Sequence, residues 1–325
     1  MTETRILVTG SQGFVGRHLR RALSARRCTV IGVDRPGTGS EVELDLATPE
    51  LDMSSLAARL GPVSGIIYMA ATITRGSSVD GPARSNLRAI ADAPVRMLEA
   101  WHALHGPTHV VYCSTYKGYG PPERLPIDPQ RPPQRPDPHS YGSAKALAER
   151  LLDIAARRTG ARYAVVRPTC IYGPGQHLHN AIPVFLRSCW QGQNPVIFGS
   201  GSELRDDVFA PDLAFCLAEA CLQRAEGPFH AAGERGRTII EVAELCCRAV
   251  AELGGPSGIR PVLDASRPPK WWIDQSFDLQ RTRNALGYEP TPLLEGLKHE
   301  ARWIKAQGSA EAFAPEPRVR TRAAS

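Results

Sequence analysis

Short apolar runs and longer helical patterns alternate along the first half of the chain. Five apolar runs of three to seven residues have the composition of buried strands, and they occupy residues 6–8, 29–33, 65–71, 108–113 and 163–167. Helical spacing of apolar residues lies between them, most clearly over residues 83–105 and 140–158. Strands that alternate with helices are typical of a doubly wound parallel sheet. The pattern therefore predicts an α/β fold for residues 1 to about 170.

The pattern is less regular beyond Gly173, where proline, glycine and aromatic residues are more frequent. Helical spacing returns at about residues 182–191, 211–224 and 238–253. We interpret this half as a smaller C-terminal α/β lobe that covers the carboxyl edge of the sheet and binds substrate. The predicted boundaries are a first domain of residues 1–172, to which the chain returns at about 204–250, a substrate-binding lobe of residues 173–203 and 251–308, and a disordered tail of residues 309–325.

Proline interrupts the regular pattern at two places. Pro94 stands inside the helical stretch 83–105 and predicts a kink there, because proline lacks the N–H group that the helix needs. Residues 121–138 contain eight prolines. This segment fits either a linker between domains or a long functional loop between a strand and a helix.

The first apolar run leads into a glycine turn. Gly10, Gly13 and Gly16 follow residues 6–8, and helical spacing begins at Phe14. A strand, a glycine turn and a helix N-terminus form a site for a dinucleotide pyrophosphate, because unpaired N–H groups and the helix dipole favour phosphate. Three glycines alone would also fit an ordinary strand-to-helix loop.

An acidic residue ends the second apolar run. Asp34 stands eighteen residues beyond Gly16, where a carboxylate can accept hydrogen bonds from the ribose hydroxyls of the adenosine. The alternative is a surface aspartate that caps a turn before Pro36. Both features together predict a Rossmann-type domain that binds NAD rather than NADP, since Asp34 would repel a 2′-phosphate. Arg35 works against this preference because it could pair with that phosphate.

A tyrosine and a lysine share one face of a predicted helix. Tyr141 and Lys145 are four residues apart, and Thr115 follows the strand at 108–113. A cation near the phenol would favour its phenolate, so the pair suits proton transfer, with the Thr115 hydroxyl bound to a substrate oxygen. The alternative is an exposed Tyr and Lys on an amphipathic helix.

These motifs, in this order, resemble the extended short-chain dehydrogenase/reductase superfamily, in its nucleotide-sugar epimerase/dehydratase group. Thr9–Gly16 is similar to TGxxGFxG, Ser114–Gly120 to SSxxxYG, and Arg167–Pro174 to the family's R…YGP segment. The resemblance implies that Thr115, Tyr141 and Lys145 are catalytic, with Tyr141 and Lys145 also touching the cofactor. The other cofactor contacts that it implies are Gly10, Gly13, Phe14, Val15, Gly16, Asp34, Arg35, Asp45, Leu46, Ala70, Ala71 and Pro168.

The resemblance extends to the second lobe, with departures. Residues 205–212 are similar to RDFVYVDD, whose arginine often meets the substrate diphosphate, which implicates Arg205. Arg267 and Asn180 are further substrate candidates, although Arg267 lacks the Gly-Asp that follows it in many epimerases. The dehydratase Asp-Glu pair is replaced by Tyr116 and Lys117, which disfavours dehydration.

Several other residues could have either a structural or a functional role. His177 and His179 fit exposed loop positions better than a substrate site, and Trp271–Trp272 fit a pocket or simple packing equally well. Cys246 and Cys247 fit a helix core better than a redox site.

Composition narrows the class of partner. The net charge of +6 comes from dispersed arginines, and no apolar run has the length of a membrane span, so neither nucleic acid nor a membrane is expected. Eight scattered cysteines without a CxxC pair suggest buried thiols in a reducing compartment and no metal site. The first strand begins near residue 5 and leaves no room for a signal peptide, so the cytoplasm is the expected location.

Three functions remain open. The leading prediction is an NAD-dependent epimerase of a nucleotide sugar that oxidises a ring hydroxyl transiently. The second is an NAD-dependent dehydrogenase or reductase of a sugar, sugar acid or other small carbonyl compound, which releases NADH. The third is a cofactor-binding scaffold without turnover, against which the intact Thr115, Tyr141 and Lys145 argue. The resemblance also implies a homodimer that pairs the helices near 83–105 and 141–158.

Overall fold

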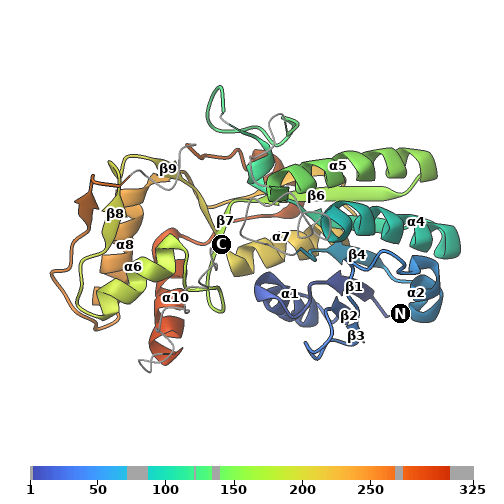
Figure 1. Ribbon diagram of the computed structural model, residues 1–325, viewed down its shortest axis with the longest axis horizontal. Coiled ribbons are helices and arrows are strands. Elements are labelled where there is room, and N and C mark those ends of the chain that lie inside the picture. The colour runs from blue at the N-terminus through green and yellow to red at the C-terminus, as the bar shows by residue number, and fades with distance from the viewer. Residues whose placement is uncertain (1–2, 72–86, 121, 134–139, 268–273, 308–325) are drawn as a thin grey trace, which may run out of the picture.

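The computed structural model describes residues 3–71, 87–120, 122–133, 140–267 and 274–307 (Figure 1). Trp271–Trp272 and the predicted tail 309–325 lie outside the described residues. None of the described helices is long and apolar enough to cross a membrane.

A seven-stranded sheet organises the larger part of the molecule (Figure 1). Every neighbouring pair of its strands is parallel, which confirms the predicted doubly wound α/β fold. The strand order reverses between β1 and β4, and such a switch point is where open α/β sheets bind ligands. In spatial order the strands are β11 (Gly227–Ala231), β6 (Arg162–Pro168), β5 (His109–Cys113), β4 (Gly65–Tyr68), β1 (Arg5–Thr9), β2 (Thr29–Asp34) and β3 (Val42–Glu43).

Helices cover both faces of this sheet. Alternate residues of β1 point to opposite faces, so Ile6 and Val8 join one buried cluster while Leu7 joins another. The first cluster lies under α1 (Phe14–Ala25) and α7 (Ala210–Leu222). The second lies under α2 (Met53–Leu60), α4 (Ala93–His105) and α5 (Ser140–Thr159). Burial on both faces explains why the strands are nearly continuous apolar runs.

The helix around Pro94 changes its hydrogen-bonding pattern, and the kink itself stays a prediction. A π-helical turn, η1 (Arg88–Asp92), comes directly before α4, and Pro94 stands in the first turn of α4. Proline is tolerated in a first turn because the N–H it lacks would have no helical partner there. Residues 83–86 of the predicted helix lie outside the described part.

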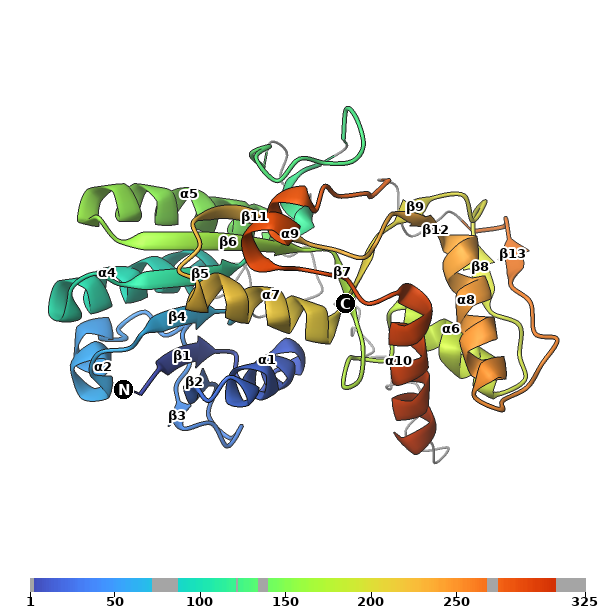
Figure 2. The same ribbon diagram turned by 180° about the vertical axis from the view of Figure 1, so that it is seen from behind.

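The smaller lobe lies beside one end of the sheet (Figures 1 and 2). Its core forms between α6 (Ala181–Trp190), α8 (Ile239–Glu252) and α10 (Leu293–Gln307). A two-stranded parallel pair, β8 (Val196–Phe198) with β13 (Val262–Asp264), belongs to it. Two further pairs connect the lobe to the sheet: β7 (Cys170–Tyr172) with β10 (Asp207–Phe209), and β9 (Leu204–Arg205) with β12 (Arg237–Thr238).

The segments that return to the large sheet differ from the expected 204–250. Helix α8 lies in that stretch, but its apolar side, with Val242, Cys246 and Val250, packs in the core of the small lobe. Conversely, α9 (Gln280–Leu286) packs against α7 and β11, whereas the sequence predicts residues 251–308 in the substrate lobe. The division into two domains remains our proposal with these two helices exchanged.

The proline-rich segment 121–138 joins two elements of one domain, β5 and α5. Ile127 forms a parallel bridge with Phe277, and its N–H donates to the Ser276 carbonyl at 2.8 Å. Because β5 and α5 both pack in the large sheet's domain, the interdomain linker is the wrong alternative, and the described residues 122–133 form a loop.

Candidate active site

The glycine turn has the geometry that a pyrophosphate requires. Gly10 has a φ of +71°, and its N–H donates to the Val33 carbonyl at 2.8 Å. A Cβ at Gly16 would lie 2.2 Å from the Gly10 carbonyl oxygen, so only glycine lets α1 pack this close to the turn. Gly13 caps α1 without any side-chain hydrogen bond. The first N–H groups of α1, including those of Phe14 and Val15, therefore lack a helical partner and are available to an anion.

The ends of β2 and β4 close around this turn. The Asp34 carboxylate accepts from the Gln12 N–H at 2.8 Å and from the Arg35 N–H at 2.8 Å. The Thr9 hydroxyl oxygen accepts from the N–H groups of Met69, at 3.0 Å, and Ala70, at 3.1 Å. Close backbone approach, free helix N–H groups and a carboxylate at the end of β2 together fit NAD.

The remaining residues predicted to contact the cofactor differ in how far their side chains are exposed to solvent. Asp45 is exposed and accepts from the Ala47 N–H at 2.9 Å, whereas Leu46 is buried in the core under α2. Ala71 and Arg35 are exposed, and Pro168 is buried at the end of β6.

The three predicted catalytic residues gather at the carboxyl end of β5. The Lys145 ammonium is buried and donates to the Cys113 carbonyl at 2.6 Å. Its nitrogen lies 4.5 Å from the centre of the Tyr112 ring and 5.9 Å from that of Tyr141. Thr115, two residues beyond Cys113, is buried, and its hydroxyl oxygen accepts from the Lys117 N–H at 3.4 Å. A phenol, an ammonium and a hydroxyl at one strand end form a group suited to proton transfer.

Burial dominates the electrostatics of this group. Burial lowers the pKa of Lys145 to about 8, and burial also raises the pKa of Tyr141 above its usual value of 10. The expectation that Lys145 lowers the pKa of Tyr141 is therefore wrong for the protein by itself. Desolvation of the phenolate outweighs a cation that bonds to a backbone carbonyl instead of the phenol oxygen.

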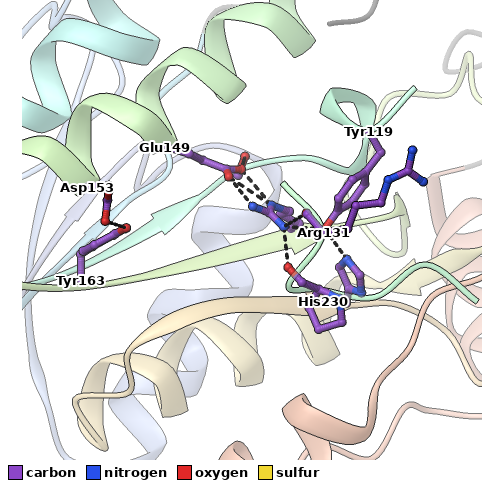
Figure 3. Close-up of polar contacts among 9 residues, drawn as sticks. Tyr119, Arg131, Glu149, Asp153, Tyr163 and His230 are labelled. Carbon is purple, nitrogen blue, oxygen red and sulfur yellow. Dashed lines mark hydrogen bonds and ion pairs between the residues drawn. The ribbon is translucent and has the colours of Figure 1, made fainter. Parts of the chain in front are cut away.

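A buried ion pair joins α5 to β6 (Figure 3). Glu149 of α5 and Arg167 of β6 are 8% and 5% exposed, and their closest atoms, Nη2 and Oε2, are 2.5 Å apart. Nε of Arg167 also donates to both carboxylate oxygens, at 3.0 and 3.2 Å, and the Ser114 hydroxyl donates to Oε1. Glu149 therefore joins α5, β6 and the residue before Thr115.

Arg167 also bonds to residues in the segment between β5 and α5. Nη1 of Arg167 donates to the Tyr119 hydroxyl at 2.5 Å and to the Pro129 carbonyl at 2.8 Å. Nδ1 of His230 lies 3.1 Å from the Asp278 carbonyl, which can only accept, so Nδ1 carries the proton. Tyr119 then donates to Nε2 of His230, at 2.7 Å (Figure 3). Burial lowers the pKa of His230 to about 3, which keeps this ring neutral.

Sequence reasoning missed this network. Glu149 does stand four residues after Lys145, on the face that carries Tyr141, and that spacing could have singled it out. No comparable signal identifies His230, which reaches Tyr119 across 111 residues of sequence.

Arg205, a predicted substrate residue, is already paired within the protein. It is 5% exposed, and its Nε donates to Oδ2 of Asp207 at 2.7 Å while Nη2 donates to Oδ1. Asp207 is 7% exposed and stands where the RDFVYVDD motif has phenylalanine. The carboxylate neutralises the guanidinium, so the pair offers little net charge to an anionic substrate.

The other two substrate candidates are exposed. The Arg267 side chain is 67% exposed, lies 3.9 Å from the Asp264 carboxylate and stacks over the Phe198 ring at 5.0 Å. Asn180 is the N-cap of α6, and its side chain makes no capping hydrogen bond. His177 and His179 are also exposed. The structure does not bring Asn180, Arg205 and Arg267 together through any direct contact among the described residues.

Two further carboxyl groups are buried close enough to Asp207 to interact with its charge. Asp206 accepts from the Gly233 N–H at 2.7 Å, and burial raises its pKa to about 7. Glu300 of α10 accepts from the Gln176 amide at 2.7 Å, and burial raises its pKa to about 8. Both groups therefore bind protons more strongly in the folded protein than in an unfolded chain.

Comparisons with known proteins agree with this geometry. A model of the NAD-dependent epimerase/dehydratase family matches residues 6–231. The dTDP-4-dehydro-6-deoxy-D-allose reductase of Streptomyces bikiniensis is 28% identical over 322 residues, which cover 92% of this chain and 96% of the relative.

Two solved structures have the same fold over most of their length. MoeE5 in complex with UDP-glucuronic acid and NAD is 27% identical, with a TM-score of 0.76 over 93% of this chain and 99% of the other. The UDP-glucose 4-epimerase of Thermotoga maritima, solved with UDP-glucose, is 25% identical, with a TM-score of 0.78 over 94% and 99%.

Proposed function

The chain belongs to the NAD-dependent epimerase/dehydratase family, and we propose that it is an epimerase of a nucleotide sugar. The observation that carries the proposal is the gathering of Thr115, Tyr141 and Lys145 at the end of β5, with the Lys145 ammonium fixed on the Cys113 carbonyl. The similarity to a UDP-glucose 4-epimerase over nearly the whole chain supports it.

Each catalytic residue has a distinct role in this proposal. Bound NAD would supply a hydride acceptor and a positive charge near the phenol. Tyr141 takes the proton of a ring hydroxyl, and Lys145 stabilises the phenolate while it binds the ribose of the cofactor. Thr115 donates to the substrate oxygen. In the second half of the reaction Tyr141 returns the proton, so the enzyme ends in its starting state.

Dehydration is a poorer fit than epimerisation. A 4,6-dehydratase needs acidic side chains directly after the catalytic threonine. Here Tyr116 is buried with its hydroxyl 3.4 Å from the Cys170 sulfur, and a half-buried Lys117 follows. Neither side chain can supply the carboxylate that the elimination uses.

A second candidate is an NAD-dependent dehydrogenase or reductase of a sugar, sugar acid or other small carbonyl compound. The Arg205–Asp207 pair favours it, because a neutralised arginine has less to offer a diphosphate. The similarity to a dTDP-sugar reductase also points to net redox chemistry. The two candidates share their catalytic residues and differ in whether NADH leaves the site.

The proposed assembly is a homodimer formed through α4 and α5. These helices pack side by side, and α5 exposes Leu147 (43%) and Ile154 (61%), seven residues apart on one face. Such a stripe is typical of a helix that pairs with another. Light scattering that finds a monomer at micromolar concentration would count against the dimer.

We further propose that the protein acts in the cytoplasm on a small-molecule substrate, without a nucleic-acid or membrane partner.

Mass spectrometry of the ligand released from denatured protein tests the proposal. An epimerase reuses its cofactor, so the purified protein should carry NAD and need none added. A co-purified nucleotide sugar would support the first candidate. Protein that purifies without cofactor and requires free NAD for turnover would favour the second.

A further inference from the structure

Two cysteines of the small lobe lie in direct contact. Cys189 is in the last turn of α6 and Cys247 is in α8, and these two helices pack together (Figure 2). The Cys189 thiol donates to the sulfur of Cys247, with the two Sγ atoms 3.5 Å apart. All eight cysteines of the chain are free thiols. A disulfide bond is about 2.05 Å long, so an approach of roughly 1.5 Å would join these two sulfurs.

The two sulfurs differ in their access to solvent. Cys189 is fully buried, whereas Cys247 is 8% exposed and lines a surface cavity of about 480 Å³. The other walls of this cavity come from α8 and the segment after it, and they include Glu244, Arg248, Pro256, Ile259 and Arg260. A molecule of liquid water takes about 30 Å³, so a reagent of the size of hydrogen peroxide has room to enter the cavity and reach Cys247.

The contact also makes Cys247 the more reactive of the two thiols. A thiolate, and not a thiol, attacks an oxidant, so a cysteine with a lowered pKa reacts first. The hydrogen bond from Cys189 lowers the pKa of Cys247, and the same bond raises the pKa of Cys189. Cys246, the preceding residue on α8, is fully buried, and burial raises its pKa. Access and charge therefore both select Cys247 as the sulfur that attacks first.

We propose that Cys247 and Cys189 form a site of reversible oxidation by a small hydroperoxide. The Cys247 thiolate attacks one peroxide oxygen and the O–O bond breaks. The departing oxygen takes up the proton that the thiol released, which leaves a sulfenic acid at Cys247. The Cys189 sulfur then attacks the Cys247 sulfur, its proton passes to the departing hydroxide, and water leaves. The two thiols together lose two electrons, the peroxide gains them, and a dithiol reverses the bond by exchange.

The disulfide would tie together two of the three helices that form the core of the small lobe. A cross-link restricts the unfolded chain, so the oxidised protein should unfold at a higher denaturant concentration than the reduced protein. Disulfides in a reducing compartment are usually transient and redox-sensing, which fits a bond that a dithiol can open. Thr115, Tyr141 and Lys145 lie on other elements, so this site does not depend on the proposed function.

Mass spectrometry of the full-length protein after treatment with hydrogen peroxide tests the site. The remaining free thiols are alkylated after unfolding, and cross-linked peptides are compared before and after reduction with dithiothreitol. A bond between Cys189 and Cys247 that disappears on reduction is the expected result. Recovery of both residues as alkylated thiols, from peroxide-treated protein whose circular dichroism is that of the folded state, would overturn the proposal.

Cys246→Ala is the matched control, because it removes the adjacent buried thiol of the same helix. The bond between Cys189 and Cys247 should form in this variant as it does in the wild type. Loss of the cross-link in Cys246→Ala, with its persistence in Cys247→Ala, would identify Cys246 as the partner and contradict the proposal.

A third variant separates the two steps. In Cys189→Ala no second thiol can close the bond, so dimedone should label a sulfenic acid at Cys247 after peroxide treatment. In Cys247→Ala the buried Cys189 should stay unlabelled. Labelling of Cys189 in the second variant, without labelling of Cys247 in the first, would overturn the order of the steps.

Discussion

The cofactor half and the substrate lobe treat anion binding in opposite ways. In the cofactor half, α1 begins without a side-chain cap, and Gly16 lets α1 pack against the turn at a distance that a Cβ would prevent. The first backbone N–H groups of α1 are thus available to a bound anion. Among the predicted substrate residues, Arg205 is buried and already held by Asp207, and Arg267 lies near Asp264. The backbone N–H groups at α1 are therefore available to a dinucleotide, whereas Arg205 and Arg267, the predicted contacts of a substrate diphosphate, lie beside carboxylates of the protein itself.

This difference explains why the sequence predicts the cofactor site better than it predicts the substrate site. A pyrophosphate bound by backbone leaves a pattern of glycines, because only glycine permits the close approach. A substrate bound by side chains leaves a pattern only if those side chains are free. Asp207 removes that freedom from Arg205, and the substrate class consequently rests on the chemistry at Tyr141 and on relatives rather than on the lobe itself.

The largest expected effect lies where the two halves meet. Tyr141→Phe removes one oxygen and little volume, so folding and NAD binding should survive. Turnover should fall by about 10²–10⁴-fold, the usual loss for a positioned acid or base. Steady-state kinetics with calorimetry of NAD binding checks this, and Thr115→Val should likewise lower turnover at nearly unchanged NAD affinity. Full activity in Tyr141→Phe would remove the catalytic assignment.

The Arg205–Asp207 pair gives the next largest effect. Asp207→Asn leaves a buried guanidinium without its counter-ion, which should destabilise the protein by about 3–5 kcal/mol in a urea titration. Asp153→Asn, which breaks an exposed pair with Arg157, should cost less than about 1 kcal/mol. If the folded variant binds UDP-sugars more tightly than the wild type, the arginine is a substrate residue that Asp207 restrains. Unchanged stability would show that the pair is not buried as described.

A third change tests the cofactor half alone. In Gly16→Ala the new Cβ meets backbone at 2.2 Å, and relief of that clash should cost about 1–3 kcal/mol of stability and weaken NAD binding. Gly254→Ala is a useful contrast, because nothing lies within 4 Å of its Cβ and only its φ of +75° opposes the change. NAD affinity should fall in the first variant alone, and equal affinity in both would contradict the close approach.

The most gradual effect concerns pH and the buried carboxyl group of Asp206, because it is spread over several pH units and is small at each step. Since the folded pKa of Asp206 is raised to about 7, the native state holds a proton that the unfolded chain has released between about pH 4 and 7. Stability from this group should therefore fall as pH rises through that window, by at most about 1.4 kcal/mol per pH unit. Thermal unfolding of wild type and Asp206→Asn across the window checks this. A dependence of the same slope in both proteins would rule out Asp206 as its source.

Local spacing made much of the site predictable, and long-range contacts made the rest invisible. The glycines of the turn and the Tyr141–Lys145 pair are motifs of residues close together in the sequence, so their spacing and the family resemblance identified them. The Glu149–Arg167 pair joins a helix to a strand eighteen residues away, and burial makes it strong. Burial also reversed the expected pKa of Tyr141, and no spacing rule reports desolvation.

Proton NMR of a UDP-sugar incubated with the purified protein, read together with near-ultraviolet absorbance, tests the central claim most directly. The account predicts that the epimer appears without added NAD and without net growth of NADH absorbance, and that Tyr141→Phe suppresses it. NADH that accumulates in proportion to the substrate consumed would contradict epimerisation and identify the protein as a dehydrogenase.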